Sequence, residues 1–124
     1  MTEQEYETII AEQDAEISIL KDKIHQASLK KMEAVKAFCD SLAEKYAEYI
    51  GKKVKITFII SDRWHEETPN EIVGFLNCFK EMGYRHIICP DIAKVKKDGT
   101  ESLQHYTEWQ TESYKYITNI ELVE

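Results

Sequence analysis

Residues 2 to 49 contain neither glycine nor proline, and this stretch constrains the fold more than any other feature of the chain. It is rich in Ala, Glu, Lys, Gln and Leu, which are strong helix formers. Thr2 followed by Glu5 has the form of a capping box, so we expect a helix to begin at once. Gly51 stands where helices commonly end in a left-handed residue. The sequence therefore predicts a helical segment over residues 1–50.

The apolar residues of this segment follow two registers. The first has spacings of three and four with a polar gap at Gln13, and it comprises Tyr6, Ile10, Ile17, Leu20, Ile24 and Ala27. The second comprises Met32, Val35, Cys39, Leu42, Tyr46 and Tyr49. The two registers do not join in phase, and the slip falls in residues 28–31. This slip predicts either a stutter within one helix or a break between two helices.

The first register is as narrow as the seam of a coiled coil. A helix of ~45 residues is ~70 Å long at the usual rise per residue, which is more than a domain of about 75 residues can cover. We expect residues 6–27 to self-associate and make the protein a homo-oligomer; the alternative is a helix folded back onto its own β domain. An antiparallel pairing is favoured, because it sets the acidic stretch Glu3–Glu16 against the basic stretch Lys21–Lys36.

After Gly51 the apolar period changes from 3.6 to 2, which is typical of half-buried strands. Turn residues divide the rest of the chain into five expected strands: residues 53–60, 72–79, 85–96, 103–109 and 114–123. We expect a bulge or a close backbone approach at Gly74, a bend at Pro90, and a hairpin turn at Lys97–Gly99. The predicted fold class is α+β, with residues 51–124 forming a mostly antiparallel bent sheet or a small barrel.

The order of these elements resembles a known family of folds. A helix precedes Gly51–Phe58, then Ile72–Leu76, then a bent third strand and a late strand at Ile117–Val123. This order looks like the topology of Sm-like and other SH3-like small barrels, over residues 45–123. The Sm residues that face RNA are not reproduced after the second strand, and Tyr116-Ile117 stands where an Arg-Gly pair is expected. The resemblance therefore predicts a fold and does not predict RNA binding.

Charge and composition exclude several classes of protein. The net charge is −7, and the first twenty residues carry six acidic residues and no Lys or Arg. This acidity disfavours a nonspecific grip on nucleic acid or on an anionic membrane. No signal peptide or membrane span is expected, so a cytoplasmic location follows. The three cysteines, Cys39, Cys78 and Cys89, have long spacings, which favours reduced, mostly buried thiols.

The loop of residues 61–70 is the segment most typical of a binding site. Arg63, Trp64 and His65 place a guanidinium, an indole and an imidazole side by side, and an exposed Trp beside Arg is the composition of an interface hot spot. The alternative is a polar hairpin loop whose Trp64 covers the barrel mouth. No nucleophile or second positioned partner stands near this loop, so we assign no catalytic residues and expect no enzyme.

A second candidate surface is basic. Lysines of the first expected strand (Lys52, Lys53 and Lys55) and of the third (Lys94, Lys96 and Lys97) would form a stripe if the two strands were adjacent, with aromatic rings such as Trp109 beside it. The alternative is that these lysines protect exposed strands from edge-to-edge pairing. The four His residues lack metal-ligand spacing and no glycine-rich phosphate loop occurs, so no metal and no cofactor is predicted.

These observations favour a non-enzymatic, oligomeric interaction module, in which the helix joins copies and the β domain binds a protein partner. Small acidic proteins of this design are common among phage and mobile-element accessory factors that bind a host protein. Two alternatives remain: a small-barrel binder of single-stranded nucleic acid that uses the lysine stripe, and a protein that holds a small ligand between protomers.

Overall fold

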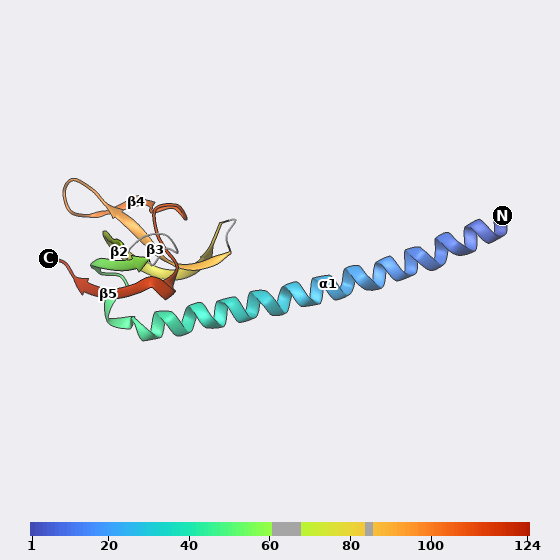
Figure 1. Cartoon of the computed structure of the whole chain (residues 1–124), viewed down its shortest axis with the longest axis horizontal. Helices are drawn as coiled ribbons and strands as arrows, with labels where there is room; N and C mark the ends of the chain where they lie inside the picture. The colour runs from blue at the N-terminus through green and yellow to red at the C-terminus, as the bar shows by residue number, and fades with distance from the viewer. Residues whose placement is uncertain (61–67, 84–85) are drawn as a thin grey trace. The chain divides into compact units, whose positions relative to one another are not determined.

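The computed structural model confirms the predicted α+β class (Figure 1). It describes residues 1–60, 68–83 and 86–124. One long N-terminal helix precedes a five-stranded antiparallel sheet. The chain forms two compact units, residues 1–34 and residues 35–124. Residues 35–50, which the sequence pattern groups with the N-terminal helix, belong to the second unit.

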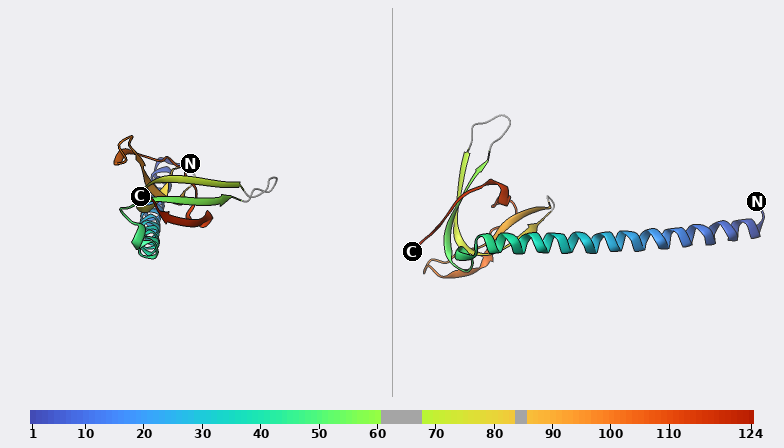
Figure 2. Two further views of the ribbon diagram at one scale, coloured as in Figure 1. Left: turned by 90° about the vertical axis from the view of Figure 1, so that its left-hand side faces the viewer. Right: turned by 90° about the horizontal axis from the view of Figure 1, so that it is seen from below.

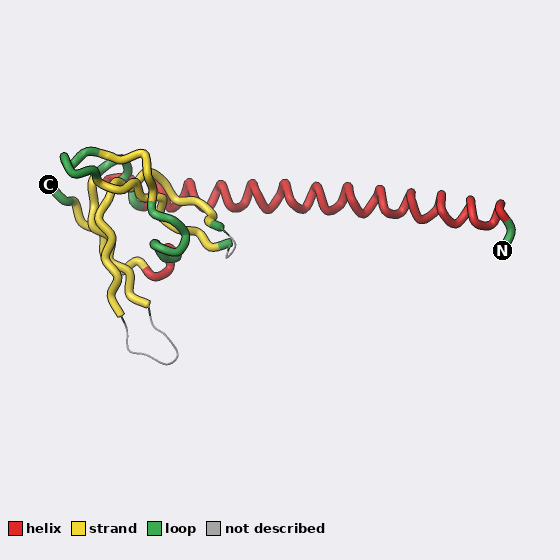
Figure 3. Tube along the Cα trace, turned by 90° about the horizontal axis from the view of Figure 1, so that it is seen from above, coloured by secondary structure: helices red, strands yellow, loops and turns green. Residues whose placement is uncertain are grey.

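Helix α1 spans Glu3–Lys45 without interruption, as Figure 3 shows. The capping box is present: the Glu5 amide donates to Thr2 Oγ1 at 3.1 Å and the Thr2 amide donates to Glu5 Oε2 at 3.4 Å. Of the two outcomes expected for the slip at residues 28–31, a break is wrong. The slip changes which side of the helix is apolar, but Ser28-Leu29-Lys30-Lys31 contains no residue that breaks the backbone ladder.

Helix α1 ends through a short 3-10 turn, η1, at Ala47–Tyr49. Gly51 follows with φ of 80°, so the expected left-handed residue is confirmed. Its amide donates to the Leu76 carbonyl at 2.7 Å, and the Leu76 amide donates to the Lys52 carbonyl at 3.2 Å. The exit from the helix is therefore fixed directly onto the second strand.

The sheet has the strand order β4-β3-β2-β1-β5. Its members are β1 (Lys53–Ile60), β2 (Thr68–Met82), β3 (Ile87–Val95), β4 (Glu101–His105) and β5 (Ile117–Leu122). Figure 2 shows β1 and β2 side by side. Their antiparallel register pairs Ile56 with Ile72. The described strands do not close into a barrel, because β4 and β5 stand at opposite edges. The sheet alternative is therefore confirmed, and the barrel alternative is wrong.

The core of the second unit lies between one face of the sheet and the last turns of α1. It contains Cys39, Leu42, Val54, Ile56, Phe58, Ile72, Leu76, Phe79, Ile92 and Ile120. The side chains of Val54, Ile56 and Phe58 alternate along β1 and are fully buried. Tyr46 stacks on Phe79 with ring centroids 5.4 Å apart. The second apolar register of the helix therefore packs against the sheet from Val35 onward, whereas Met32, its first residue, is exposed.

Three details of the strands differ from the sequence pattern or refine it. Pro90 lies in β3 opposite Phe79, while β4 pairs with β3 at Ala93 and Val95, so Pro90 lies outside that second ladder. The expected strand at 103–109 is instead β4 at Glu101–His105. The expected strand at 114–123 begins later, because Ser113 Oγ accepts from the Lys115 amide and caps a 3-10 turn, η2, at Tyr114–Tyr116.

The turn between β3 and β4 confirms the expected hairpin. Gly99 has φ of 88°, and its amide donates to the Lys96 carbonyl at 2.9 Å. Asp98 Oδ1 accepts hydrogen bonds from the Thr100 hydroxyl at 2.6 Å and from the Thr100 amide at 3.0 Å. These hydrogen bonds lower the pKa of the Asp98 carboxyl below its usual value.

Gly74 confirms the expected close approach, and we expect Gly74→Ala to destabilise the sheet. A Cβ at this position would meet the Ala93 carbonyl oxygen and the Ile92 side chain of the adjacent strand. Overpacking of this kind typically costs about 1–3 kcal/mol. Urea unfolding of the full chain measures the effect, with Glu71→Ala on an exposed position of β2 as the control. A loss below about 0.5 kcal/mol, the range of ordinary surface substitutions, would contradict the close packing.

The Asp98 turn generates a second prediction. Because the folded pKa of Asp98 is lowered, its stabilising effect is present above the unfolded pKa and is lost as the pH falls through the folded pKa. An NMR titration that follows the Thr100 amide should therefore show a midpoint below the reference value of 3.8. Thr100→Val, which removes the hydroxyl donor, should move the midpoint upward. An identical midpoint in both proteins would rule out the hydroxyl contribution.

Candidate functional site

The first candidate surface is the apolar stripe of the first unit. Residues 1–34 are all exposed, including the large side chains of the first register. We call Tyr6, Ile10, Gln13, Ile17, Leu20, Ile24 and Ala27 the seam, because they recur at alternating intervals of four and three on continuous helix. Ile24 keeps 67% of its surface exposed, and Leu20 keeps 50%. Removing Leu and Ile side chains from water is favourable in free energy, so we expect the seam to pack against another apolar surface.

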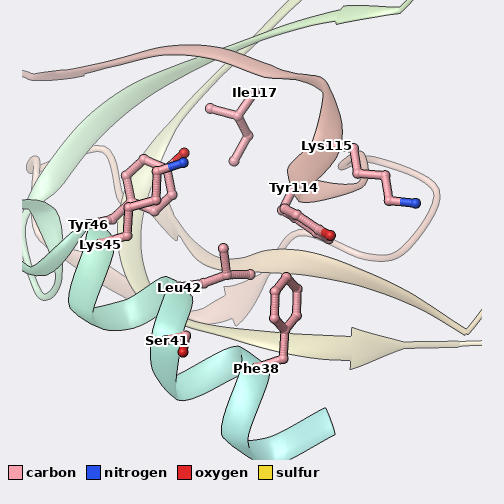
Figure 4. Close-up of a pocket in the computed structure, with 8 residues that line it drawn as sticks. All are labelled: Phe38, Ser41, Leu42, Lys45, Tyr46, Tyr114, Lys115 and Ile117. Carbon is pink, nitrogen blue, oxygen red and sulfur yellow. The ribbon is translucent and has the colours of Figure 1, made fainter. Parts of the chain in front are cut away.

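The second candidate is a cleft of about 440 Å³ within the second unit (Figure 4). It is lined by Phe38, Ser41, Leu42, Lys45, Tyr46, Tyr114, Lys115 and Ile117. The rings of Phe38 and Tyr114 meet edge to face, with centroids 5.1 Å apart. The lysines come from two elements, Lys45 from α1 and Lys115 from η2. The cleft can hold an apolar ring against Tyr114, with an anionic group of that ligand near a lysine.

A third cluster surrounds Asp91, whose side chain is largely buried in β3. Asp91 Oδ1 lies 2.8 Å from His105 Nδ1 and 3.7 Å from Lys80 Nζ, and Oδ2 lies 3.7 Å from Cys78 Sγ. The cluster joins strands β2, β3 and β4. Cys78 and His105 donate hydrogen bonds to the carboxylate, His105 in the tautomer that carries its proton on Nδ1, and Lys80 forms an ion pair with it. These partners offset the unfavourable free energy of burying the Asp91 carboxylate in the sheet.

The chemistry of this cluster argues against covalent catalysis. Burial and the neighbouring Asp91 carboxylate raise the pKa of the Cys78 thiol. Burial likewise raises the pKa of the Cys39 thiol. A thiol with a raised pKa remains protonated at neutral pH and is a weak nucleophile. The carboxylate of Asp91 therefore suppresses ionisation of Cys78, against the weaker opposing effect of Lys80.

The last three residues of the predicted binding loop, residues 68–70, belong instead to strand β2 and pair with β1. Arg63, Trp64 and His65 lie outside the described residues. Trp109, by contrast, lies between β4 and η2 and keeps 73% of its surface exposed. Leu103 on the edge strand β4 keeps 96%. These two apolar side chains are the most exposed large ones in the described part of the second unit.

The predicted lysine stripe is wrong in its geometry. The lysines of the first strand were Lys52, Lys53 and Lys55, and those of the third were Lys94, Lys96 and Lys97. Strand β2 lies between β1 and β3, so the two groups do not stand on adjacent strands. Lys55 Nζ pairs with Glu121 Oε1 at 2.8 Å, and Lys94 Nζ lies 5.4 Å from the centre of the Tyr106 ring. Strand order, which the sequence pattern did not determine, separates the charges.

The described residues hold neither a candidate metal cluster nor a candidate membrane-spanning helix. They contain no group of three or more His, Cys, Asp and Glu side chains that could hold a metal ion. No helix among them is both long enough and apolar enough to cross a membrane. All three cysteines lie in the described part of the chain and carry thiols rather than disulfides.

Sequence reasoning missed the cleft and the Asp91 cluster for identifiable reasons. The cleft depends on Phe38, which lies beside the second apolar register, and on Tyr114, which was assigned to a strand. The Asp91 cluster depends on an irregularity in the pairing of β2 with β3 between Leu76 and Cys78. Asp91 stands as a single carboxylate within the otherwise apolar stretch 87–93, and this is the sequence signal for a buried polar group.

A comparison of the chain with protein-family models, with curated proteins and with solved structures finds no match.

The environment of Cys78 generates a testable prediction. We expect Cys78 to react slowly with iodoacetamide at pH 7.5, because burial and Asp91 keep the thiolate fraction low. Asp91→Asn removes the charge and should raise the rate at Cys78 several-fold, whereas Asp98→Asn in the distant turn should leave it unchanged. Mass spectrometry of peptides measures each cysteine separately. A Cys78 rate that is equal in all three proteins would contradict the proposed influence of Asp91.

Proposed function

We propose that this protein is a non-enzymatic interaction module that assembles with copies of itself through residues 3–34 and uses residues 35–124 to bind a protein partner in the cytoplasm. The observation that carries the proposal is the exposed seam, a row of apolar side chains along a helix whose residues 1–34 are all exposed. Hydrophobic burial is the main driving force of protein association, and a second apolar seam is the surface that this one fits.

The physics of a lone helix supports the same proposal. Formation of an isolated helix is marginal in water, because most helical stability in proteins comes from packing of an apolar face. Residues 3–34 contain strong helix formers and a capping box, which start the helix but add little beyond local stability. Pairing of seams supplies the packing that this unit does not obtain from its own residues.

The second unit supports a binding role more than a catalytic one. Its most exposed large apolar side chains are Leu103 and Trp109, and exposed aromatic residues are enriched where proteins bind proteins. The cluster around Asp91 holds a thiol with a raised pKa and joins three strands of the sheet. A protein partner is therefore favoured over single-stranded nucleic acid, because the lysines that a nucleic acid would need stand on separated strands.

Assembly through the seam can be tested with a pair of adjacent residues. We expect Leu20→Glu to shift the full-length protein from an oligomer to a monomer, because a carboxylate in the seam would be buried without a partner. Ile19→Glu is the matched control: Ile19 is the preceding residue and is 57% exposed, yet it lies outside the seam. It should leave the oligomer intact. Light scattering coupled to size exclusion measures the molar mass of each protein against 14.5 kDa for one chain.

A monomeric unmodified chain would refute the assembly proposal outright. Equal dissociation of the oligomer by both substitutions would show that helix charge in general, rather than the seam, controls assembly. Circular dichroism of the same samples separates dissociation from a loss of the fold of the second unit.

A further inference from the structure

We infer that the seam pairs with the seam of a second copy in an antiparallel, two-stranded coiled coil, with Ile17 of one chain opposite Leu20 of the other. This inference rests on the proposed function and adds the orientation and register of the pairing. Three features of the helix support it: the residue types along the seam, the distribution of charge beside it, and its polar end.

The seam has the heptad pattern of a coiled coil. Continuous helix over Glu3–Lys45 keeps its heptad positions aligned. The β-branched residues Ile10, Ile17 and Ile24 recur every seven residues at one core position, and Leu20 occupies the other. Apolar residues that recur at both core positions of a heptad are the pattern of a coiled-coil seam. Gln13 is a single polar residue among the apolar ones of the seam, and in the register given above it lies opposite Ile24 of the second copy.

A parallel pairing places identical residues opposite each other. It brings the acidic first twenty residues of both chains together, where each chain carries six carboxylates and no Lys or Arg. It also places Lys31, which takes the next seam position after Ala27, against Lys31 of the second copy. Among the residues that flank the seam, only Glu16 and Lys21 of the second copy form an attractive pair in this orientation. Like charges therefore oppose this orientation along much of the helix.

An antiparallel pairing centred between residues 18 and 19 reverses each of these relations. It places Lys31 against Tyr6, where an ammonium can rest on an aromatic ring. It brings Glu16 beside Lys23 and Asp14 beside Lys21 of the second copy, and the two-fold symmetry repeats both pairs. The acidic first half of each helix then faces a second half, residues 21–34, that carries four lysines and two acidic residues.

The packing along the core of the pair follows from the same register. Ile17 meets Leu20 at the centre, Gln13 meets Ile24, and the large Ile10 meets the small Ala27. Antiparallel helices also place opposite ends of their dipoles together, which is favourable. Charge, core packing and the polar end at Lys31 therefore favour one orientation and one register.

Disulfide trapping distinguishes the two orientations. Gln13→Cys and Ile24→Cys are made separately in the full chain, and one of the two carries a mass tag. In the antiparallel register position 13 faces position 24 of the second copy. Two copies of position 13 are then ~16 Å apart along the axis, at 1.5 Å rise per residue. We expect the mixture to yield the mixed disulfide dimer in a glutathione buffer, and each variant alone to remain mostly uncrosslinked. The unmodified chain controls for Cys39, Cys78 and Cys89.

The outcomes separate the orientation from the assembly itself. Efficient crosslinking of each variant alone, in a protein that light scattering shows to be a dimer, would establish a parallel pair and overturn this inference while leaving the proposed function intact. A dimer that crosslinks in neither sample would overturn the register. A monomer in every sample would overturn both proposals.

Discussion

The free energy of exposing the seam to water is the constraint on which this account depends. Burial of one large aliphatic side chain contributes about 1.5–3 kcal/mol, and the seam carries several of them on a helix that buries none in its own unit. Helix propensity alone adds little stability to this segment, because most helical stability in proteins comes from packing of an apolar face. A protein with this helix therefore gains stability whenever a second apolar surface covers the seam.

The second unit has a different physical organisation. The last turns of α1, from Val35 to Lys45, pack Cys39 and Leu42 against the sheet and complete its core. The same turns form one wall of the aromatic cleft through Phe38 and Tyr46. One continuous helix thus belongs to both units, with a seam suited to self-assembly in its first part and a core face in its second. The change in apolar register near residues 28–31 marks the transition between these roles.

The features that were predictable from the sequence are local ones. The capping box at Thr2 and Glu5, the left-handed Gly51 and the hairpin at Lys97–Gly99 each depend on a few neighbouring residues. Gly74 was identifiable because a glycine inside a strand pattern commonly marks a close approach. The continuity of α1 was not determined by the pattern, because a change in side-chain phase leaves backbone hydrogen bonding unaffected.

Features that depend on strand order or pairing register were not predictable in this way. The lysines of β1 and β3 are separated in space because β2 lies between these two strands, and no local property of the strands specifies that order. Asp91 meets Cys78 through an irregular register between β2 and β3, and it meets His105 across the β3–β4 pair. The aromatic period at Tyr114 and Tyr116 resembled a strand, but the Ser113 cap produces a 3-10 turn first. The loop with Arg63, Trp64 and His65 lies outside the described residues, so its role stays a prediction.

Hydrogen–deuterium exchange at several protein concentrations tests the central claim most directly. Association through the seam predicts that the amides of residues 6–31 become more protected as the concentration rises, because pairing stabilises a helix that is marginal alone. Amides of β1, Lys53–Ile60, serve as the internal reference and should be insensitive to concentration. Protection of residues 6–31 that is the same at all concentrations, in a protein whose mass stays that of one chain, would contradict the account.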